Sequence, residues 1–220
     1  MNTVMSDKSD STMMVPEFGW TTTSPQCSAP YIVPVLKNIV KKLGLQGRLL
    51  DVGCGNGFNA NKYVSWGFDV VGVDVSVEGI AIAKNAYPQV QFESIEICAD
   101  LLSRIDQNPF DAVSSTEVVE HLYDPHAWAK CCYNALRPGG VLIASTPYHG
   151  FLKNLFIAVA NGWGRHHEPL RNGGHIKFFN NAQLSQLLMD AGFHEIRFIG
   201  VGRAPLLWKS IIVIALKPKE

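Results

Sequence analysis

The 220-residue sequence lacks an excess of either charge, since Lys plus Arg and Asp plus Glu each total 19. No summed positive field attracts a polyanion, so a nucleic-acid partner is not expected. The chain also lacks a basic region followed by an apolar core at its start, and it has no run of the roughly 18 apolar residues that a spanning helix needs. We therefore expect no signal peptide or transmembrane helix, and a cytoplasmic location that leaves open a peripheral contact with the inner face of the membrane.

Cysteine pairs suited to bridging are missing as well. The five cysteines form no C-x-x-C pair, and the two that are close in sequence, Cys131 and Cys132, are adjacent. Adjacent cysteines seldom bridge without strain, which argues against a disulfide framework or a zinc knuckle and indicates a reducing compartment. No internal repeat is visible. With 47% apolar residues, the chain suits one domain with a sizeable core.

Residues 1–28 are rich in Ser, Thr, Asp and Met without periodicity, and prolines interrupt them. We expect a flexible tail or lid there, and a single domain over residues 29–220. Apolar spacing predicts an amphipathic helix over 31–43, after which short apolar strands alternate with helical segments. The expected strands are 48–52, 69–73, 90–94, 110–115, 141–145, 194–200 and 208–216. The expected helices after the first are 58–66, one that Ser76 caps and that runs to about residue 86, one that Asp124 caps and Pro138-Gly139-Gly140 closes, and 180–191.

Strands that alternate with helices predict an α/β fold, a doubly wound and mostly parallel sheet covered on both faces. The last two strands are close enough in sequence to pair antiparallel, as a C-terminal hairpin. The alternation is interrupted after Pro147, where an insertion of residues 148–174 precedes the last expected helix.

The first strand runs into a glycine-rich turn, Asp51-Val52-Gly53-Cys54-Gly55-Asn56-Gly57. Such a turn lets a ligand approach the backbone at the carboxyl edge of the sheet. Asp74 ends the second strand, where its carboxylate can accept hydrogen bonds from both hydroxyls of a ribose. A dinucleotide site would want a glycine at the position of Phe58, and Asp51 suits a cationic ligand better than a diphosphate. The pattern therefore favours a nucleoside that carries a sulfonium, whereas a tight turn without a ligand leaves both acids unexplained.

A polar cluster follows the fourth strand. If its segment is helical, Glu117, Glu120 and His121 lie at i, i+3 and i+4 and face one way. Two carboxylates and an imidazole can bind a divalent cation, or they can orient a general base that removes a proton from an acceptor hydroxyl. The alternative is that the glutamates favour a helix N-terminus and that His121 caps or packs. These three residues are our candidate catalytic residues and candidate metal ligands.

Several motifs together resemble those of the class I S-adenosylmethionine-dependent methyltransferases. They occur in the family's order, at residues 49–57, 70–74, 110–113, 117–122 and 136–140. The resemblance covers about residues 31–216 and implies a seven-stranded Rossmann-like sheet whose last strand is reversed. It also implies that Gly53, Gly55 and Asn56 line the methionine moiety of the cofactor and that Asp51 lies near its ammonium group.

The same resemblance assigns the residues around the nucleoside. Asp74 would hold the ribose, Val75 would flank the adenine, and Thr116 would lie beside the sulfonium. For the adenine amino group the family often has an Asp-Ala pair after the third strand, and this sequence has Glu96 and Ile97 instead.

The residues 117–122 before Asp124-Pro125, together with Ser145-Thr146-Pro147, resemble the ubiquinone-biosynthesis O-methyltransferase subfamily. In that subfamily the matching Glu, Glu and His are associated with a magnesium or zinc ion, whereas many methyltransferases carry a Glu-His here without metal. A looser match at 173–179 suggests a polyprenyl catechol. We expect O-methylation of a small aromatic or lipid-like acceptor. An N- or C-methyltransferase and a non-catalytic S-adenosylmethionine-binding protein are the alternatives.

The insertion contains apolar residues that would form one stripe on a helix. They are Leu152, Leu155, Phe156, Val159 and Trp163, and the cationic or titratable residues Arg165, His166, His167 and Arg171 follow. An apolar stripe with a cationic end can engage lipid headgroups, and the resemblance implies membrane association through the matching insertion. Residues 151–171 are therefore expected to make a peripheral membrane contact, with a lid or a dimer contact as alternatives. The oligomeric state stays open.

Overall fold

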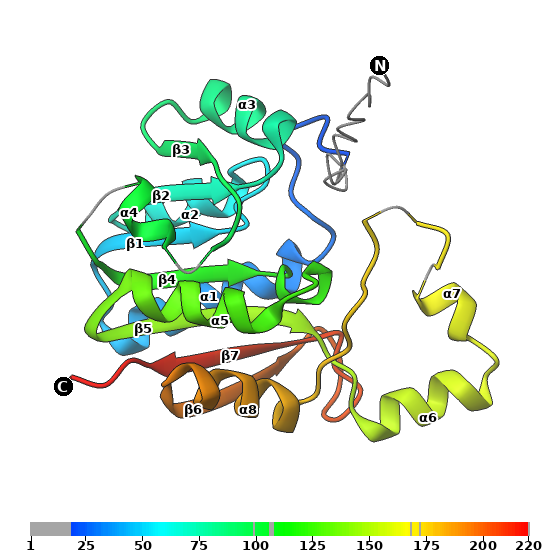
Figure 1. Ribbon diagram of the computed structural model, residues 1–220. Coiled ribbons are helices and arrows are strands. Elements are labelled where there is room, and N and C mark those ends of the chain that lie inside the picture. The colour runs from blue at the N-terminus through cyan, green and yellow to red at the C-terminus, as the bar shows by residue number, and fades with distance from the viewer. Residues whose placement is uncertain (1–18, 99, 106–107, 168, 172, 220) are drawn as a thin grey trace, which may run out of the picture.

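The computed structural model describes residues 19–98, 100–105, 108–167, 169–171 and 173–219. Its centre is a seven-stranded sheet in the order β3-β2-β1-β4-β5-β7-β6 (Figure 1). The strands are β1 (Gly47–Val52), β2 (Phe68–Asp74), β3 (Gln91–Ser94), β4 (Phe110–Thr116), β5 (Leu136–Pro147), β6 (His194–Val201) and β7 (Ser210–Leu216).

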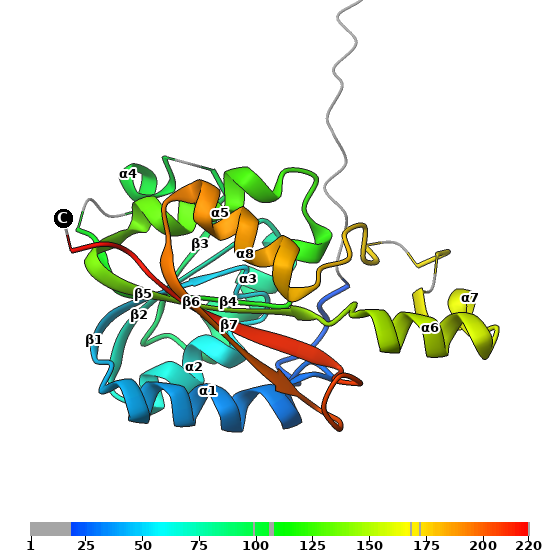
Figure 2. The same cartoon turned by 90° about the horizontal axis from the view of Figure 1, so that it is seen from below.

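Helices cover both faces of this sheet, as Figure 2 shows from below. One face packs against α1 (Ala29–Leu43), α2 (Phe58–Ser65) and α3 (Val77–Ala86). The other face packs against α4 (Leu101–Ile105), α5 (Pro125–Ala135) and α8 (Asn181–Ala191). Helices α6 (Phe151–Val159) and α7 (Trp163–His167) extend from the end of β5 away from the sheet.

The strand directions confirm the predicted α/β fold with its C-terminal hairpin. Strands β1 to β5 pair in parallel, β7 pairs antiparallel with β5, and β6 pairs antiparallel with β7. Parallel strands covered on both faces have no solvent side, which explains why β1, β2 and β4 each bury at least four consecutive residues. All five parallel strands deliver their carboxyl ends to one edge, so the turns that follow them share that edge.

Local capping explains where two helices begin. Ser76 accepts a hydrogen bond from Gly79 N at 3.0 Å and starts α3 at the predicted position. Asn180 and Gln183 form a capping box at the start of α8, because each side chain bonds the other residue's backbone N–H. Both caps could be recognised in the sequence, since a polar N-cap precedes an apolar periodic run.

Some predicted elements were wrong in extent. The helix that Pro138-Gly139-Gly140 was predicted to close already ends at Ala135, because β5 begins at Leu136 and continues through the Pro-Gly-Gly segment with a register shift against β4. Helix α4 was not predicted, and its five residues are too few for a periodic signal. The single apolar helix predicted in the insertion is broken, because Asn161 adopts a positive φ of 49° and Trp163 starts α7.

Helix α6 has an inverted pattern of burial. It buries Lys153 and Ile157, whereas Phe151, Phe156 and Val159 are 76%, 68% and 80% exposed. The residues of the predicted apolar stripe are therefore exposed. No helix within the described ranges is long and apolar enough to cross a membrane.

The difference between core and insertion predicts different responses to one chemical change. Leu142 on β5 is fully buried, so Leu142→Ala is expected to lower the free energy of unfolding by about 2–5 kcal/mol through lost apolar contacts and a cavity. Leu155 on α6 is 47% exposed, and Leu155→Ala should change it by less than about 0.5 kcal/mol. Denaturant unfolding of both variants measures the contrast, and equal losses would mean that α6 is packed as firmly as the sheet.

Candidate active site

The glycine turn after β1 depends on backbone conformations that side chains disfavour. Gly53, Gly55 and Gly57 all have positive φ, at 77°, 52° and 78°. A Cβ atom at Gly53 would lie 2.4 Å from a methyl carbon of Val118. Gly53 N and Cys54 N both donate to Val73 O on β2, at 2.8 and 3.0 Å. The turn is therefore held against the end of β2, at the carboxyl edge of the sheet.

Asp74 fixes the turn and faces the same edge. Its Oδ2 accepts from Gly55 N at 2.7 Å and its Oδ1 accepts from Ser76 N at 2.8 Å. Burial raises the pKa of this carboxyl, and the two backbone N–H groups oppose that rise. Each carboxylate oxygen can accept a second hydrogen bond, so these contacts are compatible with the predicted ribose contact.

Asp51 is a buried carboxylate whose partners are incomplete. Burial raises its pKa to about 7, a hydrogen bond with Ser114 lowers it, and the charge of Asp74 raises it further. Among the described residues, no hydrogen-bond partner reaches its Oδ2 atom. A buried carboxylate oxygen without a partner is costly unless a ligand pairs with it. A cationic ligand group, such as an ammonium, would satisfy this atom.

The adenine side of the predicted site is assembled by two consecutive strand ends. Ile95 N donates to Asp74 O at 3.0 Å, and Ser94 Oγ donates to Val75 O at 3.5 Å. These bonds bring Val75 beside the segment that contains Glu96 and Ile97. Glu96 is exposed and Ile97 is partly buried. The roles of these three residues stay predictions.

Asn56 holds the segment that precedes α1. Its Nδ2 donates to Thr22 O at 2.8 Å and to Ser24 O at 2.9 Å. Trp20 lies so close to the turn that a Cβ at Gly55 would be 2.3 Å from its ring. Between Trp20, the turn and Thr116 lies a cavity of about 20 Å³. Residues 19–28 thus lie over the glycine turn, and residues 1–18 of the predicted tail or lid lie outside the described residues.

The acid-histidine segment corrects the helical prediction for residues 117–121. Glu117 has a positive φ of 56°, and only Val119–His121 form a single 3-10 turn. Glu117 Oε1 accepts from Ser145 Oγ at 2.8 Å, and its Oε2 accepts from Ser210 Oγ at 3.1 Å. Glu117 is therefore bonded toward β5 and β7, and it does not share one helical face with Glu120 and His121.

Glu120 and His121 instead meet His175, which follows the insertion. One potential ligand atom from each of these three residues lies within 4.8 Å of the other two. Glu120 Oε2 accepts from Thr146 Oγ1 at 3.0 Å, and its buried Oε1 has no hydrogen-bond partner among the described residues. The backbone carbonyl of Glu120 accepts from Ile176 N and Lys177 N, which fixes the returning chain beside it.

Burial controls the protonation of this group. It raises the pKa of Glu117 to about 7, and it raises that of Glu120 well above its usual range, with the charge of Glu117 adding to the effect. Burial also lowers the pKa of His121 and takes that of His175 to about 4. Near neutral pH both imidazoles are therefore uncharged, and each has a nitrogen able to accept a proton or a metal ion.

Two residues near this edge were not predicted. His175 stands in the Gly173-Gly174-His175 stretch of the looser subfamily match, but its approach to His121, with ring centroids 4.9 Å apart, depends on the path of the insertion. Trp20 lies in a segment without periodicity, so no pattern marks it.

The reversed β7, the glycine turn, the two buried acids and the polar group after β4 together define a class I S-adenosylmethionine-dependent methyltransferase. The chain belongs to the methyltransferase domain family, whose family model matches residues 29–196. The match contains the turn, both acids and the segment of Glu117, Glu120 and His121.

Named relatives and a solved structure agree with this assignment. A ubiquinone biosynthesis O-methyltransferase of Coxiella burnetii is 31% identical over 173 residues, which cover 78% of this chain and 74% of that protein. One of Psychrobacter arcticus is 30% identical over 172 residues, 75% of this chain and 66% of that protein. The chain thus spans about two thirds to three quarters of their lengths. The crystal structure of magnesium protoporphyrin IX methyltransferase from Synechocystis, with bound S-adenosylhomocysteine, has the same fold, with a TM-score of 0.64. The two sequences are 21% identical, and the superposition covers 84% of this chain and 82% of that one.

The raised pKa of Asp51 predicts a pH dependence of cofactor binding. An ammonium group binds the ionised carboxylate, so affinity for S-adenosylhomocysteine should rise with pH through the Asp51 pKa of about 7. The ionised fraction of a group with that pKa grows about tenfold from about pH 6 to about pH 8, which sets the size of the effect. Asp51→Asn should bind more weakly and without this slope, as calorimetry would measure. The exposed Asp69→Asn is the matched control and should keep the slope, and an identical slope in Asp51→Asn would contradict the contact.

Proposed function

We propose that this enzyme transfers the methyl group of S-adenosylmethionine to a hydroxyl oxygen of a small aromatic or lipid-like acceptor. The observation that carries the proposal is the group of Glu120, His121 and His175 at the carboxyl edge, in which Glu120 is buried, His121 partly buried and His175 exposed. Glu120 and His121 follow shortly after Thr116, the last residue of β4. A base beside the methyl donor is what an acceptor hydroxyl needs and what a neutral amine does not. The names of the two relatives support an oxygen acceptor.

Toward the methyl donor, the chain's contribution is to hold S-adenosylmethionine in a fixed orientation. When bound, S-adenosylmethionine supplies an electrophilic methyl group on its sulfonium. In this proposal Asp51 pairs with the ammonium group, Asp74 accepts from the ribose, and the glycine turn admits the methionine moiety. Fixing the donor in this way converts methyl transfer into an effectively unimolecular step, and alignment of this kind can supply several kcal/mol of the barrier, on the order of 7–11 in well-oriented systems.

His121 is the residue best prepared to take the acceptor's proton. Its Nδ1 lies 3.2 Å from Gly174 O, and because a carbonyl only accepts, Nδ1 carries the proton in that bond. In the neutral ring Nε2 is then the basic nitrogen, and it lies 4.0 Å from Glu120 Oε1. As the acceptor oxygen attacks, a carbon–oxygen bond forms, the carbon–sulfur bond breaks with its electron pair going to sulfur, and His121 Nε2 receives the proton.

The same atoms also suit a divalent metal ion. The buried Glu120 Oε1 and two neutral imidazoles form a mixed oxygen and nitrogen donor set, which fits the metal association that the subfamily resemblance implies. Glu120, His121 and His175 would hold the ion, and it would stabilise the ionised acceptor oxygen. Glu117 is less suited to be a ligand, because both of its oxygens already accept hydrogen bonds from serines.

We expect Glu120→Gln and His121→Ala to lower kcat by about 10²-fold or more, because each removes part of the group that handles the proton. Affinity for S-adenosylhomocysteine should stay unchanged, since neither side chain belongs to the donor contacts. Single-turnover kinetics with a catechol acceptor and calorimetry measure the two effects. The exposed Glu195→Gln is the control for loss of a carboxylate.

A chelator distinguishes the two versions of this chemistry. Loss of turnover on chelation, restored by added magnesium or zinc, supports the metal version. Turnover that resists the chelator while His121→Ala is inactive supports the metal-free base. Full activity in Glu120→Gln and His121→Ala, or turnover with amines but not with phenols and catechols, would contradict the proposal.

We further propose that the insertion makes a peripheral contact with an anionic membrane surface, through the exposed apolar side of α6 and the adjoining Trp163. Phe156 and Val159 are largely exposed, and Trp163 is 53% exposed at the start of α7. A face of this kind is costly in water and gains free energy at a headgroup boundary. Arg165 follows at once and supplies a positive charge toward anionic lipid.

Flotation with anionic liposomes tests this contact. The wild type should rise with the vesicles, and a Phe156→Asp, Trp163→Asp double variant should stay in the dense fraction, because it places two carboxylates in the apolar face. The matched control is Leu43→Asp, Met189→Asp, which adds the same charge at exposed apolar positions outside the insertion and should still float. A wild type that does not float, combined with loss of turnover on a water-soluble acceptor in the first variant, would identify the insertion as a lid.

A further inference from the structure

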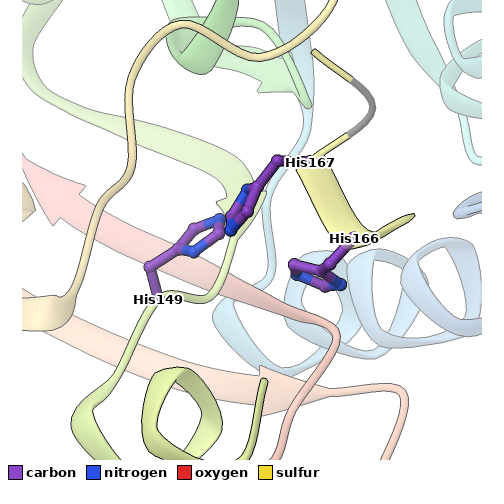
Figure 3. A group of neighbouring side chains, drawn as sticks. All are labelled: His149, His166 and His167. Atoms are coloured by element: carbon purple, nitrogen blue, oxygen red, sulfur yellow. The ribbon is translucent and has the colours of Figure 1, made fainter. Parts of the chain in front are cut away.

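Three histidines from the two ends of the α6–α7 segment come together. His149 follows β5, and His166 and His167 are the last two residues of α7 (Figure 3). One ring nitrogen from each lies within 4.8 Å of the others. The ring centroids of His149 and His167 are 5.4 Å apart and those of His166 and His167 are 4.9 Å apart. This group shares no residue with the group of Glu120, His121 and His175, although His166 and His167 lie near enough to His175 for their charges to lower its pKa.

The two sides of the group differ in how firmly they are held. His149 is buried, its backbone N donates to Phe179 O at 2.9 Å, and its carbonyl accepts from Asn154 Nδ2 at 3.2 Å. Helix α7 has five residues, and all five are exposed or only partly buried. Anything that binds all three histidines would therefore tie α7 to the fixed end of β5.

Each of these imidazoles, in its neutral form, offers one basic nitrogen to a metal ion. Among the described residues, His167 Nε2 is buried without a hydrogen-bond partner. An unpartnered buried nitrogen is an independent indication of a ligand at this position.

The surroundings decide which class of ligand fits. Lys153 and Arg203 place positive charge near these rings, so neither a hard cation held by charge nor an ion that needs carboxylates is favoured. Lys153 Nζ is itself bonded to Tyr148 O at 2.6 Å, and the carboxylate of Glu117 interacts with it. Three neutral imidazoles suit a borderline divalent ion such as Zn²⁺, which binds them through coordinate bonds and takes a further ligand from solvent.

We propose that His149, His166 and His167 form a binding site for Zn²⁺ that clamps α7 to the carboxyl end of β5. The ion sets the position of the α6–α7 insertion relative to the sheet, and it takes no part in methyl transfer. This inference does not rest on the nature of the methyl acceptor.

Calorimetric titration of the metal-stripped full-length protein with ZnCl₂ tests the site. His166→Ala and His149→Asn should each weaken one Zn²⁺-binding event by at least about tenfold, since loss of a single supporting group already has effects of that order. His166 is exposed, so its replacement leaves the folded core intact, and the exposed His126→Ala on α5 is the matched control that should bind as the wild type does. Co²⁺ should give the intense visible absorption of tetrahedral coordination in the wild type and not in His166→Ala.

The neighbouring acid-histidine group must be excluded as the source of binding. A His121→Ala, His175→Ala double variant should keep the event that His166→Ala removes. A chelator would remove metal from both groups, so the variants, rather than the chelator, show which group binds the ion.

If Zn²⁺ clamps α7 to the end of β5, it should protect the insertion from proteolysis. Zn²⁺ should slow tryptic cleavage after Arg165 and Arg171 in the wild type and leave the rate in His166→Ala unchanged. Equal Zn²⁺ affinity and equal Co²⁺ spectra in the wild type and His166→Ala, or loss of all binding in the His121→Ala, His175→Ala variant, would overturn the proposal. Zn²⁺ binding without any protection from trypsin would overturn the clamp.

Discussion

The hydrogen bond from Gly55 N to Asp74 Oδ2 is the contact on which the geometry of the predicted donor site depends. It joins the turn after β1 to the end of β2, and two further bonds to Val73 O hold the start of the same turn. The positive φ values of the glycines are compatible with this arrangement and would strain other residues. Because the backbone N–H groups of Gly55 and Ser76 both bind the Asp74 carboxylate, it is oriented before any ligand arrives. Preorganisation of this kind lowers the entropic cost of binding.

Most of the sheet could be predicted because the forces that form it leave local marks. Strands buried on both faces are short apolar runs, and helices begin at polar caps such as Ser76 and Asn180. The elements that could not be predicted have non-local causes. Glu117 adopts a positive φ where its side chain bonds serines that are 28 and 93 residues away, and no window of neighbouring residues contains that information. Helix α4 is too short to have a period.

The candidate site was predictable to the extent that its residues adjoin strand ends. Asp51, Asp74 and Thr116 were predicted at the carboxyl edge, and the structure has all three there, because the direction of a parallel strand fixes where its last residue lies. His175 was missed as a partner of His121, since the two meet only through the return path of the insertion. The histidine cluster of His149, His166 and His167 was missed for the same reason. The sequence analysis named His166 and His167 only as titratable residues that follow the apolar stripe of the insertion.

The order of the site residues along the chain divides the domain at the end of β4. The predicted donor contacts lie at or before Thr116, and the acid-histidine group, the insertion and the histidine cluster lie after it. Strand β4 pairs with β1 on one side and with β5 on the other, so this division falls in the middle of the sheet. If the predicted contacts are right, substitutions downstream of β4 alter the groups offered to the methyl acceptor and leave the predicted donor contacts in place.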